Sequence, residues 1–141
     1  MRKYRVGAHT KFDMKVHLVW IPKYRRKLLY HRERDVVVRT IKQWARIKGI
    51  KIIEGHAMGD HVHLCLAIPP KYSVAEMIGL LKGKSASEVM SFGKGKSRLV
   101  RGRTFWARGY CVSTVGLDEQ TVREYIKNQE EADRRQEEMP L

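Results

Sequence analysis

The sequence predicts an α+β fold, in which an antiparallel sheet carries helices on one face and a further helix follows it. Two patterns support this prediction. Stretches in which every second residue is apolar, as in a half-buried strand, alternate with longer stretches in which apolar residues recur every three or four positions, as in a helix. Glycine and proline separate the stretches, and both residues interrupt regular structure. The predicted order is strand, helix, strand, strand, helix, strand, helix.

The first strand and the first helix are defined by their apolar spacing and by their ends. A strand is expected at residues 14–21, where apolar side chains alternate, and Pro22 ends it. A helix is expected from about 30 to 48, because its apolar residues fall on one face and Gly49 is a natural stop. These two elements form the first β-α unit.

A hairpin is expected next, followed by the second helix. Residues 50–58 and 61–68 have the composition of strands, and the residues between them, Gly59 and Asp60, suit a tight turn. The second helix begins with a capping box at Ser73 and extends to about Phe92.

The segment at 93–108 is rich in Gly, Lys, Arg and Ser, which predicts a flexible basic connection anchored by Phe105 and Trp106. A short strand follows at 110–115, and Gly116 can supply a hinge.

The last helix is expected at about 117–136, with Asp118 as its cap and a fraying charged end over residues 132–141. The first six elements then form the split β-α-β-β-α-β pattern of ferredoxin-like and RNA-recognition-type folds. That pattern leaves one sheet face open, so the last helix must cover it, either in the same chain or in a partner chain.

Length and composition suit one compact domain. A chain of 141 residues with 43% hydrophobic residues can bury a sizeable core, so we expect a single domain over residues 1–141 with its core at about 10–116. No apolar stretch approaches the roughly 20 residues that span a bilayer, and no signal core follows the basic N-terminus. The two cysteines, Cys65 and Cys111, lack disulfide spacing. These features predict a cytoplasmic protein with reduced thiols and no membrane partner.

The charge distribution predicts a polyanionic partner. The net charge is +14, and the segment from residue 117 onward holds eight of the 15 acidic residues but only four of the 29 basic ones, so the rest of the chain is strongly basic. Nucleic acid is the favoured partner of such a surface. A solvated face or an anionic-membrane patch is the alternative, but no amphipathic apolar helix accompanies the basic segments.

Two histidines give the chain its most informative motif. His61 and His63 alternate with apolar residues in the third predicted strand, so both imidazoles project from one face of the sheet, roughly 7 Å apart. Two neutral ring nitrogens could hold a divalent metal with positions left open for substrate. A solvated or hydrogen-bonded pair is the plain alternative. Cys65 shares the face, so a zinc site of His61, His63 and Cys65 is also conceivable, although three ligands on one strand converge poorly.

A second constellation lies in the last helix. Tyr125 and Gln129 are four residues apart, which places them on one helix face, one turn apart. A phenol that can act as a nucleophile is thereby held beside an amide oxygen that can complete a metal site.

The His61-Val62-His63 motif with Tyr125 resembles the HUH endonucleases, named for histidine, a bulky hydrophobic residue and histidine. The whole chain is similar to the single-tyrosine transposases of the IS-two-hundred / IS-six-oh-five insertion-sequence family. The matching segments occur in the family's order at residues 19–26, 59–64, 81–83, 109–116 and 125–129.

The resemblance implies a role for each site residue. His61, His63 and Gln129 would be metal ligands, and Tyr125 would be the nucleophile that forms a 5′-phosphotyrosine link. The metal in this family is usually Mg²⁺ or Mn²⁺, and two imidazoles suit Mn²⁺ better than Mg²⁺. Asp60 could orient a histidine or a metal-bound water, or it could be a plain turn residue.

The resemblance also implies an obligate homodimer with shared active sites, in which Gly116 is the hinge that lets the tyrosine helix of one chain reach the histidines of the other. The substrate would be single-stranded DNA with hairpins near the element ends. The candidates for DNA contact, each of which could instead be a solvated charge, are Lys23, Arg25, Arg26, Lys82, Lys84 and Arg108.

Three other functions remain open at this point. One is a zinc hydrolase that uses His61, His63 and Cys65. The same fold could serve as a non-catalytic module that binds single-stranded nucleic acid. The chain could also be a host-adopted relative that processes palindromic repeats and no longer moves an element.

Overall fold

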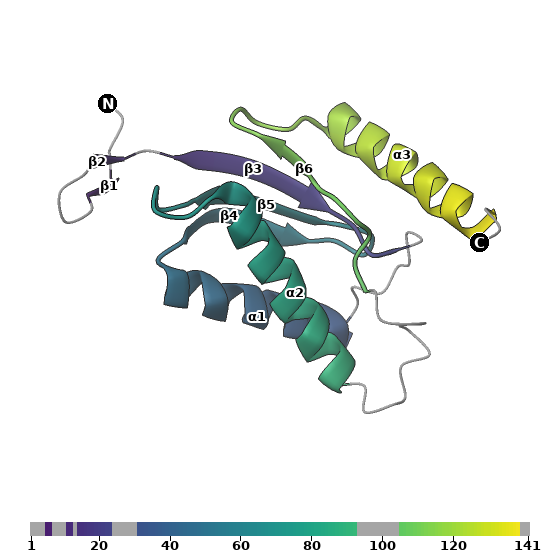
Figure 1. Ribbon diagram of the computed structural model, residues 1–141, viewed down its shortest axis with the longest axis horizontal. Coiled ribbons are helices and arrows are strands. Elements are labelled where there is room, and N and C mark those ends of the chain that lie inside the picture. Colours follow the sequence, from purple (N-terminus) through teal and green to yellow (C-terminus); the bar gives the residue numbers. More distant parts are fainter. Residues whose placement is uncertain (1–4, 7–10, 13, 24–30, 93–104, 139–141) are drawn as a thin grey trace.

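The computed structural model describes residues 5–6, 11–12, 14–23, 31–92 and 105–138. Its elements follow the predicted order, with one additional pair of short strands at the N-terminus (Figure 1). They are β1 (Arg5–Val6), β2 (Lys11–Phe12), β3 (Lys15–Trp20), α1 (His31–Lys48), β4 (Lys51–Ala57), β5 (Val62–Ala67), α2 (Val74–Phe92), β6 (Cys111–Ser113) and α3 (Glu119–Glu138).

Four strands form one antiparallel sheet in the order β4-β5-β3-β6. The centre of the sheet is therefore β5 and β3, and its edges are β4 and β6. This is the strand order of the split β-α-β-β-α-β pattern, so the predicted ferredoxin-like, RNA-recognition-type topology is confirmed. A bulge in β4 between Ile52 and Glu54 shifts its register against β5.

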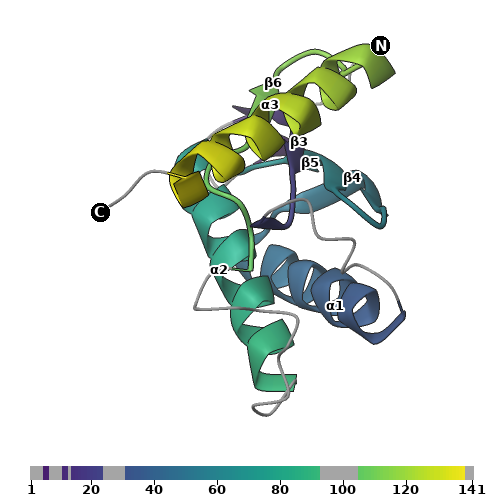
Figure 2. The ribbon, with the colours of Figure 1, turned by 90° about the vertical axis from the view of Figure 1, so that its right-hand side faces the viewer.

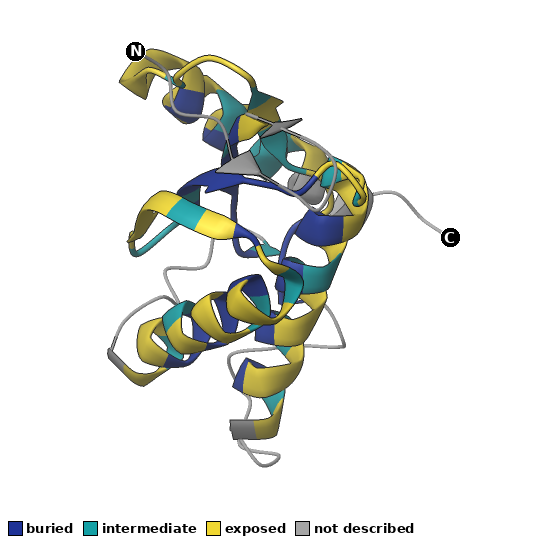
Figure 3. Cartoon of the chain, turned by 90° about the vertical axis from the view of Figure 1, so that its left-hand side faces the viewer, coloured by how far each residue is buried: buried dark blue, intermediate teal, exposed yellow. Residues whose placement is uncertain are grey.

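Helices α1 and α2 cover one face of this sheet (Figure 1). The strand residues that alternate toward them, such as Leu18 and Leu66, are completely buried, as are Val37 of α1 and Leu81 of α2. Buried residues gather on the inner sides of both helices, whereas their outward turns are exposed (Figure 3). The amphipathic spacing of the sequence therefore sets which side of each helix meets the sheet.

Helix α3 lies on the opposite face of the sheet, above the β3–β6 side (Figure 2). Its Val122 and Ile126 pack against Val19 and Ile21 of the β3 segment and against Ala107. Asp118 caps the helix, since its Oδ1 accepts a hydrogen bond from the Thr121 amide at 2.7 Å. Residues on both faces of β3 are thus buried, one set by each helical layer.

The structure confirms most element predictions and corrects one. The capping box is present, because Ser73 Oγ accepts a hydrogen bond from the Glu76 amide at 3.0 Å. Phe105 and Trp106 are buried anchors, as expected, while the predicted flexible connection falls mostly at 93–104, outside the described residues. The predicted fraying from residue 132 is wrong: α3 continues to Glu138, because Ala, Arg, Gln and Glu at its end all favour helix.

Candidate active site

The two predicted metal ligands lie at the turn between β4 and β5. His63 is in β5 and His61 immediately precedes it, so both project from the sheet face that carries α3. The Nδ1 atom of His61 is 2.8 Å from Oδ1 of Asp60, and both side chains are mostly buried. The carboxylate can only accept, so Nδ1–H donates and Nε2 is the nitrogen left to face a ligand. This hydrogen bond fits the orienting role predicted for Asp60, which stays a prediction.

A cavity of about 640 Å³ lies between this turn and the start of α3. Asp60, His61 and His63 form one wall, and Arg123 and Lys127 project from the helix that forms the other. Arg123 also forms an ion pair with Glu119, one turn earlier in α3. Imidazoles and cations therefore meet in one hollow, which suits a phosphate group.

The surroundings of His63 favour its neutral imidazole. Burial lowers its pKa, and the neighbouring histidines His61, His17 and His56 lower the pKa further. A metal ligand must be neutral imidazole, so the pair and its carboxylate fit a divalent ion. Within the described residues, no group of three or more His, Cys, Asp or Glu side chains is placed to hold a metal ion.

Tyr125 and Gln129 are not among the residues that line this cavity. The ring of Tyr125 packs against the buried residues between α3 and the sheet, which include Val19 and Ile126. Its hydroxyl oxygen is buried. Helix α3 presents its Glu119, Arg123 and Lys127 side to the cavity instead. The structure thus brings the histidine pair together with Asp60 and leaves the tyrosine and the amide outside the cavity wall.

Gly116, the predicted hinge, is exposed, and its φ is not positive. A Cβ added there would meet no atom within 4 Å. Nothing in this conformation requires glycine at 116, and its hinge role stays a prediction.

The candidates for DNA contact occupy different surroundings. Lys84 and Arg108 are exposed, and the Lys84 ammonium lies 4.5 Å from the ring centroid of Trp44. Lys23 is half-buried. Arg25 and Arg26 lie outside the described residues.

Lys82 forms specific hydrogen bonds within the protein. Its Nζ donates to the carbonyl oxygens of Ala107 at 2.9 Å and Gly109 at 2.8 Å, tying α2 to the chain that enters β6. The indole of Trp106 donates to the Lys82 carbonyl at 3.1 Å and to Ser85 Oγ at 3.0 Å. We call these contacts the Lys82 clasp. Burial lowers the pKa of Lys82 to about 8.

Replacing Lys82 by methionine should lower the free energy of unfolding by about 1–3 kcal/mol, because the carbonyls of buried Ala107 and exposed Gly109 both lose their donor. The difference in free energy of unfolding between the wild type and Lys82→Met should grow as the pH rises from 8 to about 10.5. In that range the folded chain has released a proton that the unfolded chain still binds, so raising the pH favours the fold, and the neutral amine still donates both bonds. Urea titrations across this range test it. Lys84→Met is the matched control, and an equal loss in both variants would contradict the clasp.

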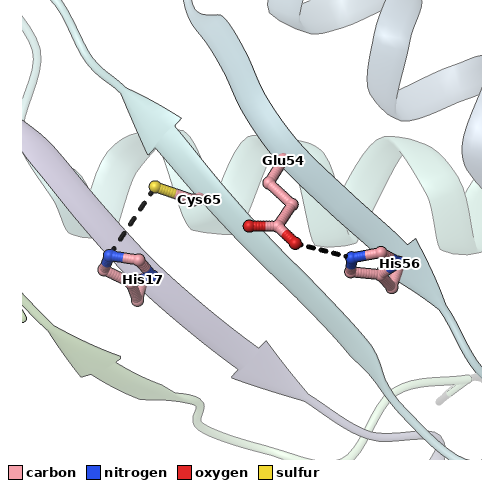
Figure 4. A network of polar contacts seen from close by, with 4 residues as sticks. All are labelled: His17, Glu54, His56 and Cys65. Atoms are coloured by element: carbon pink, nitrogen blue, oxygen red, sulfur yellow. Dashed lines mark hydrogen bonds and ion pairs between the residues drawn. The ribbon is translucent and has the colours of Figure 1, made fainter. Parts of the chain in front are cut away.

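Sequence reasoning missed two groups of polar residues. Arg34, Lys42 and Arg46 form an exposed cationic side of α1, which their helical spacing could have revealed. Glu54, His56 and His17 line one hollow with His63 and Cys65. Glu54 contacts His56, and His17 contacts Cys65 (Figure 4). Their alternation was visible in the strands, but their proximity depends on the register between β3, β4 and β5.

An RNA-recognition-type sheet with a His-X-His pair, followed by a tyrosine-bearing helix, defines the class of single-tyrosine HUH transposases. Comparison with known proteins agrees. The family model described as "Transposase IS200 like" matches residues 10–129. The chain is 40% identical over 135 residues to the transposase for insertion sequence element IS200 of Salmonella typhimurium. The aligned residues cover 95% of this chain and 88% of the relative. This chain therefore belongs to the IS200-like transposase family.

Other relatives support the same assignment. The chain is 29% identical over 125 residues to the ISDra2 transposase TnpA of Deinococcus radiodurans, covering 87% of this chain and 89% of the relative. A crystal structure of a Deinococcus radiodurans R1 protein assigned as a transposase superimposes with a TM-score of 0.75 at 27% identity, over 89% of this chain and 97% of that one. A REP-associated tyrosine transposase bound to a REP hairpin shares the fold, with a TM-score of 0.57 at 12% identity over 89% of this chain and 68% of that one. No helix in the described part of the chain is long and apolar enough to cross a membrane.

Proposed function

We propose that this transposase cleaves and rejoins single-stranded DNA at insertion-sequence ends through a covalent link to Tyr125. The observation that carries the proposal is the cavity that combines the oriented His61–Asp60 pair and His63 with Arg123 and Lys127. A phosphodiester fits there because its charge meets cations on one wall and the donor set for a metal on the other.

The proposed reaction conserves the number of phosphodiester bonds. The phenol oxygen of Tyr125 attacks the scissile phosphorus, the bond to the 3′ oxygen breaks, and that oxygen leaves as a 3′-hydroxyl with the proton that the phenol gave up. The 5′ end stays on Tyr125 as a phosphotyrosine. The 3′-hydroxyl of another strand can reverse the step, so rejoining needs no nucleotide hydrolysis.

A divalent ion, Mg²⁺ or Mn²⁺, would be held by His61, His63 and the amide oxygen of Gln129, and when bound it would neutralise charge on the scissile phosphate. The chain's own residues do the rest. Asp60 fixes the tautomer of His61, and Arg123 and Lys127 attract the phosphate to the cavity while α3 lies in the position seen here, before it is exchanged.

A partner chain supplies the tyrosine in this proposal. Tyr125 and Gln129 of the same chain do not line the histidine cavity, so α3 must be placed differently before the reaction. Exposed apolar residues beside the proposed hinge fit an interface: Val112 is 44% and Val115 70% exposed, and both lie at the β6 edge of the sheet. A homodimer that exchanges α3 would bring Tyr125 of one chain to the His61 cavity of the other.

Mixing two inactive variants tests this exchange. In a homodimer with shared sites, a mixture of Tyr125→Phe and His61→Ala chains should recover about a quarter of the wild-type cleavage, because half of the dimers are mixed and each has one complete site. Each variant alone should be inactive. Recovery should fail if tyrosine and histidines act within one chain. A mixture of Tyr125→Phe with the double variant is the control, since it can form no complete site.

The proposed DNA partner is a single strand folded into hairpins near the element ends, bound in the prokaryotic cytoplasm at the nucleoid. The high net charge of +14 supports a polyanion, and the REP-associated tyrosine transposase that shares this fold was solved bound to a REP hairpin, which supports the hairpin partner.

The zinc-site alternative makes an opposite prediction at Cys65. This thiol is buried, and its Sγ lies 3.7 Å from His17 Nε2. Burial raises the pKa of Cys65, which disfavours the thiolate that zinc requires. Cys65→Ser should therefore keep its Mn²⁺ affinity, measured by calorimetry, and should still form the covalent DNA adduct. Loss of bound metal and adduct together would support a zinc hydrolase instead.

The test of the proposed function is a covalent-adduct assay. Purified protein is incubated with Mn²⁺ or Mg²⁺ and labelled single-stranded DNA from its own element ends, then resolved on a denaturing protein gel. A labelled band at the mass of protein plus DNA supports the reaction. Hairpin binding without an adduct under either metal would favour the non-catalytic binding module.

A further inference from the structure

Two hollows extend from the histidine cavity around the β4 edge of the sheet. One is a groove of about 330 Å³ between α1 and β4, and Met58 lines both this groove and the histidine cavity. The other is a hollow of about 870 Å³ on the outward side of α1, and it shares Arg34, Val38 and Lys42 with the groove. Because neighbouring hollows share lining residues, one continuous surface leads from the histidine cavity past the sheet edge to α1.

The outward side of α1 is strongly cationic. Among the described residues that line its hollow, Asp35 is the one acid, against the four bases Arg34, Arg39, Lys42 and Arg46. All four bases are exposed, and none of the ion pairs between described residues involves them. Arg34 and Lys42 lie about two helical turns apart, as do Arg39 and Arg46, so the four share one side of the helix. From Arg34 to Arg46 the helix rises roughly 18 Å, which suits several successive phosphates of one DNA strand.

The groove between α1 and β4 adds apolar surface and backbone donors. Ile53 is 44% and Met58 is 50% exposed, although both side chains are large and apolar. Exposed apolar side chains beside cations are typical of an interaction site, and the face of a nucleobase can pack on them. Since β4 is an edge strand, N–H groups on its free side can donate to phosphate oxygens. Glu54 is the one acid among the described residues of the groove, against two of the α1 cations, and its Oε1 lies 2.9 Å from His56 Nε2.

We propose that this surface binds the single-stranded DNA that continues from the scissile phosphate. Arg34, Lys42 and Arg46 hold its phosphates, and Met58 packs against a base where the strand passes over the sheet edge. Charge complementarity selects a polyanion, because cations outnumber acids both in the groove and on α1. Continuity with the histidine cavity selects the strand that is cleaved rather than a separate partner.

The proposed contacts are to the sugar-phosphate backbone, so this site holds strands of any sequence. The inference rests on the proposed cleavage of single-stranded DNA and adds the path of the strand outside the histidine cavity.

The salt dependence of binding tests this path. The probes are the element-end hairpin alone and the same hairpin with a single-stranded extension that runs past the cleavage site. Binding is measured in EDTA, so that no cleavage occurs. In the triple variant Arg34→Gln, Lys42→Gln and Arg46→Gln, affinity for the extended probe should fall by at least about tenfold, whereas affinity for the hairpin alone should change by less than about twofold. The slope of log K against log salt for the extended probe should become shallower by about 2, since each phosphate contact of a single strand contributes about 0.7.

The matched control is the triple variant Lys15→Gln, Lys51→Gln and Lys71→Gln. These three lysines are exposed, and they line neither the histidine cavity nor the two hollows. Their loss removes the same charge, yet the control should keep the wild-type affinity and slope for the extended probe. Thermal melts should show that all three proteins are folded.

An unchanged slope in the α1 variant overturns the proposed path, and so does an equal loss in the control. An equal loss with both probes also overturns it, because α1 would then bind the hairpin itself. Failure of the proposed reaction is seen separately, as the absence of a covalent adduct between the wild type and the extended probe under Mn²⁺ or Mg²⁺.

Discussion

Replacing Tyr125 by phenylalanine should abolish the covalent protein–DNA adduct and reduce cleavage of single-stranded element ends by at least about a thousandfold. The change removes one oxygen and keeps the ring, which packs against the cluster of Val19 and Ile126, so the fold should persist. The loss would be in the chemical step, because phenylalanine has no atom that can attack phosphorus. The measurement is the labelled band on a denaturing gel, together with single-turnover cleavage rates.

The control for this experiment is Tyr72→Phe. Tyr72 lies just before α2, where the ammonium groups of Lys48 and Lys71 approach its ring, and it packs against the core on the other side of the sheet. It should form adduct at the wild-type rate. Hairpin affinity should be equal in both variants and the wild type. An adduct that persists in Tyr125→Phe would place the nucleophile on another residue and end the assignment of Tyr125.

Replacing His61 by alanine should lower Mn²⁺ affinity and cleavage by more than a hundredfold, because one of two imidazole ligands is lost. Asp60→Asn should lower metal affinity by about 10–100-fold, since the carboxylate that holds His61 Nδ1 at 2.8 Å no longer carries a charge. A larger loss of Mn²⁺ affinity in His61→Ala than in Asp60→Asn would distinguish a metal ligand from the residue that orients it. Calorimetric titration with Mn²⁺ measures affinity without requiring activity.

Asp35→Asn on the exposed side of α1 is the matched carboxylate control and should bind Mn²⁺ as the wild type does. Chelation by EDTA should stop cleavage in every active protein, and added Mn²⁺ should restore it. The metal site is wrong if His61→Ala binds Mn²⁺ with unchanged affinity, or if cleavage persists in EDTA.

Local pattern was enough to predict the fold and the sheet face on which the two histidines lie. Alternation within a strand is a property of neighbouring residues, so it placed His61 and His63 on one face before any packing was known. The cap at Asp118 and the capping box at Ser73 were equally local, and both are present. The strand order followed because few topologies connect this sequence of elements. The short β1–β2 pair was not predicted, since two-residue strands carry no periodicity.

Only the tertiary structure determined which segments that are distant in the sequence contact one another. The sequence put Tyr125 and Gln129 on one face of a helix, but only the packing of α3 shows that this face lies outside the cavity that holds His61 and His63. Lys82 was a candidate for DNA contact by charge alone, whereas folding places its ammonium on two carbonyls of the chain that enters β6.

The sequence by itself determined the element order, the paired histidines and the tyrosine helix, because each depends on spacing within one segment. Only the tertiary structure brings Glu54, His17 and His63, which lie on three different strands, together around one hollow. A shift of one residue in the pairing of β4 with β5 would turn Glu54 to the other face of the sheet. Register between strands is fixed by burial of the whole core, and no short motif encodes it.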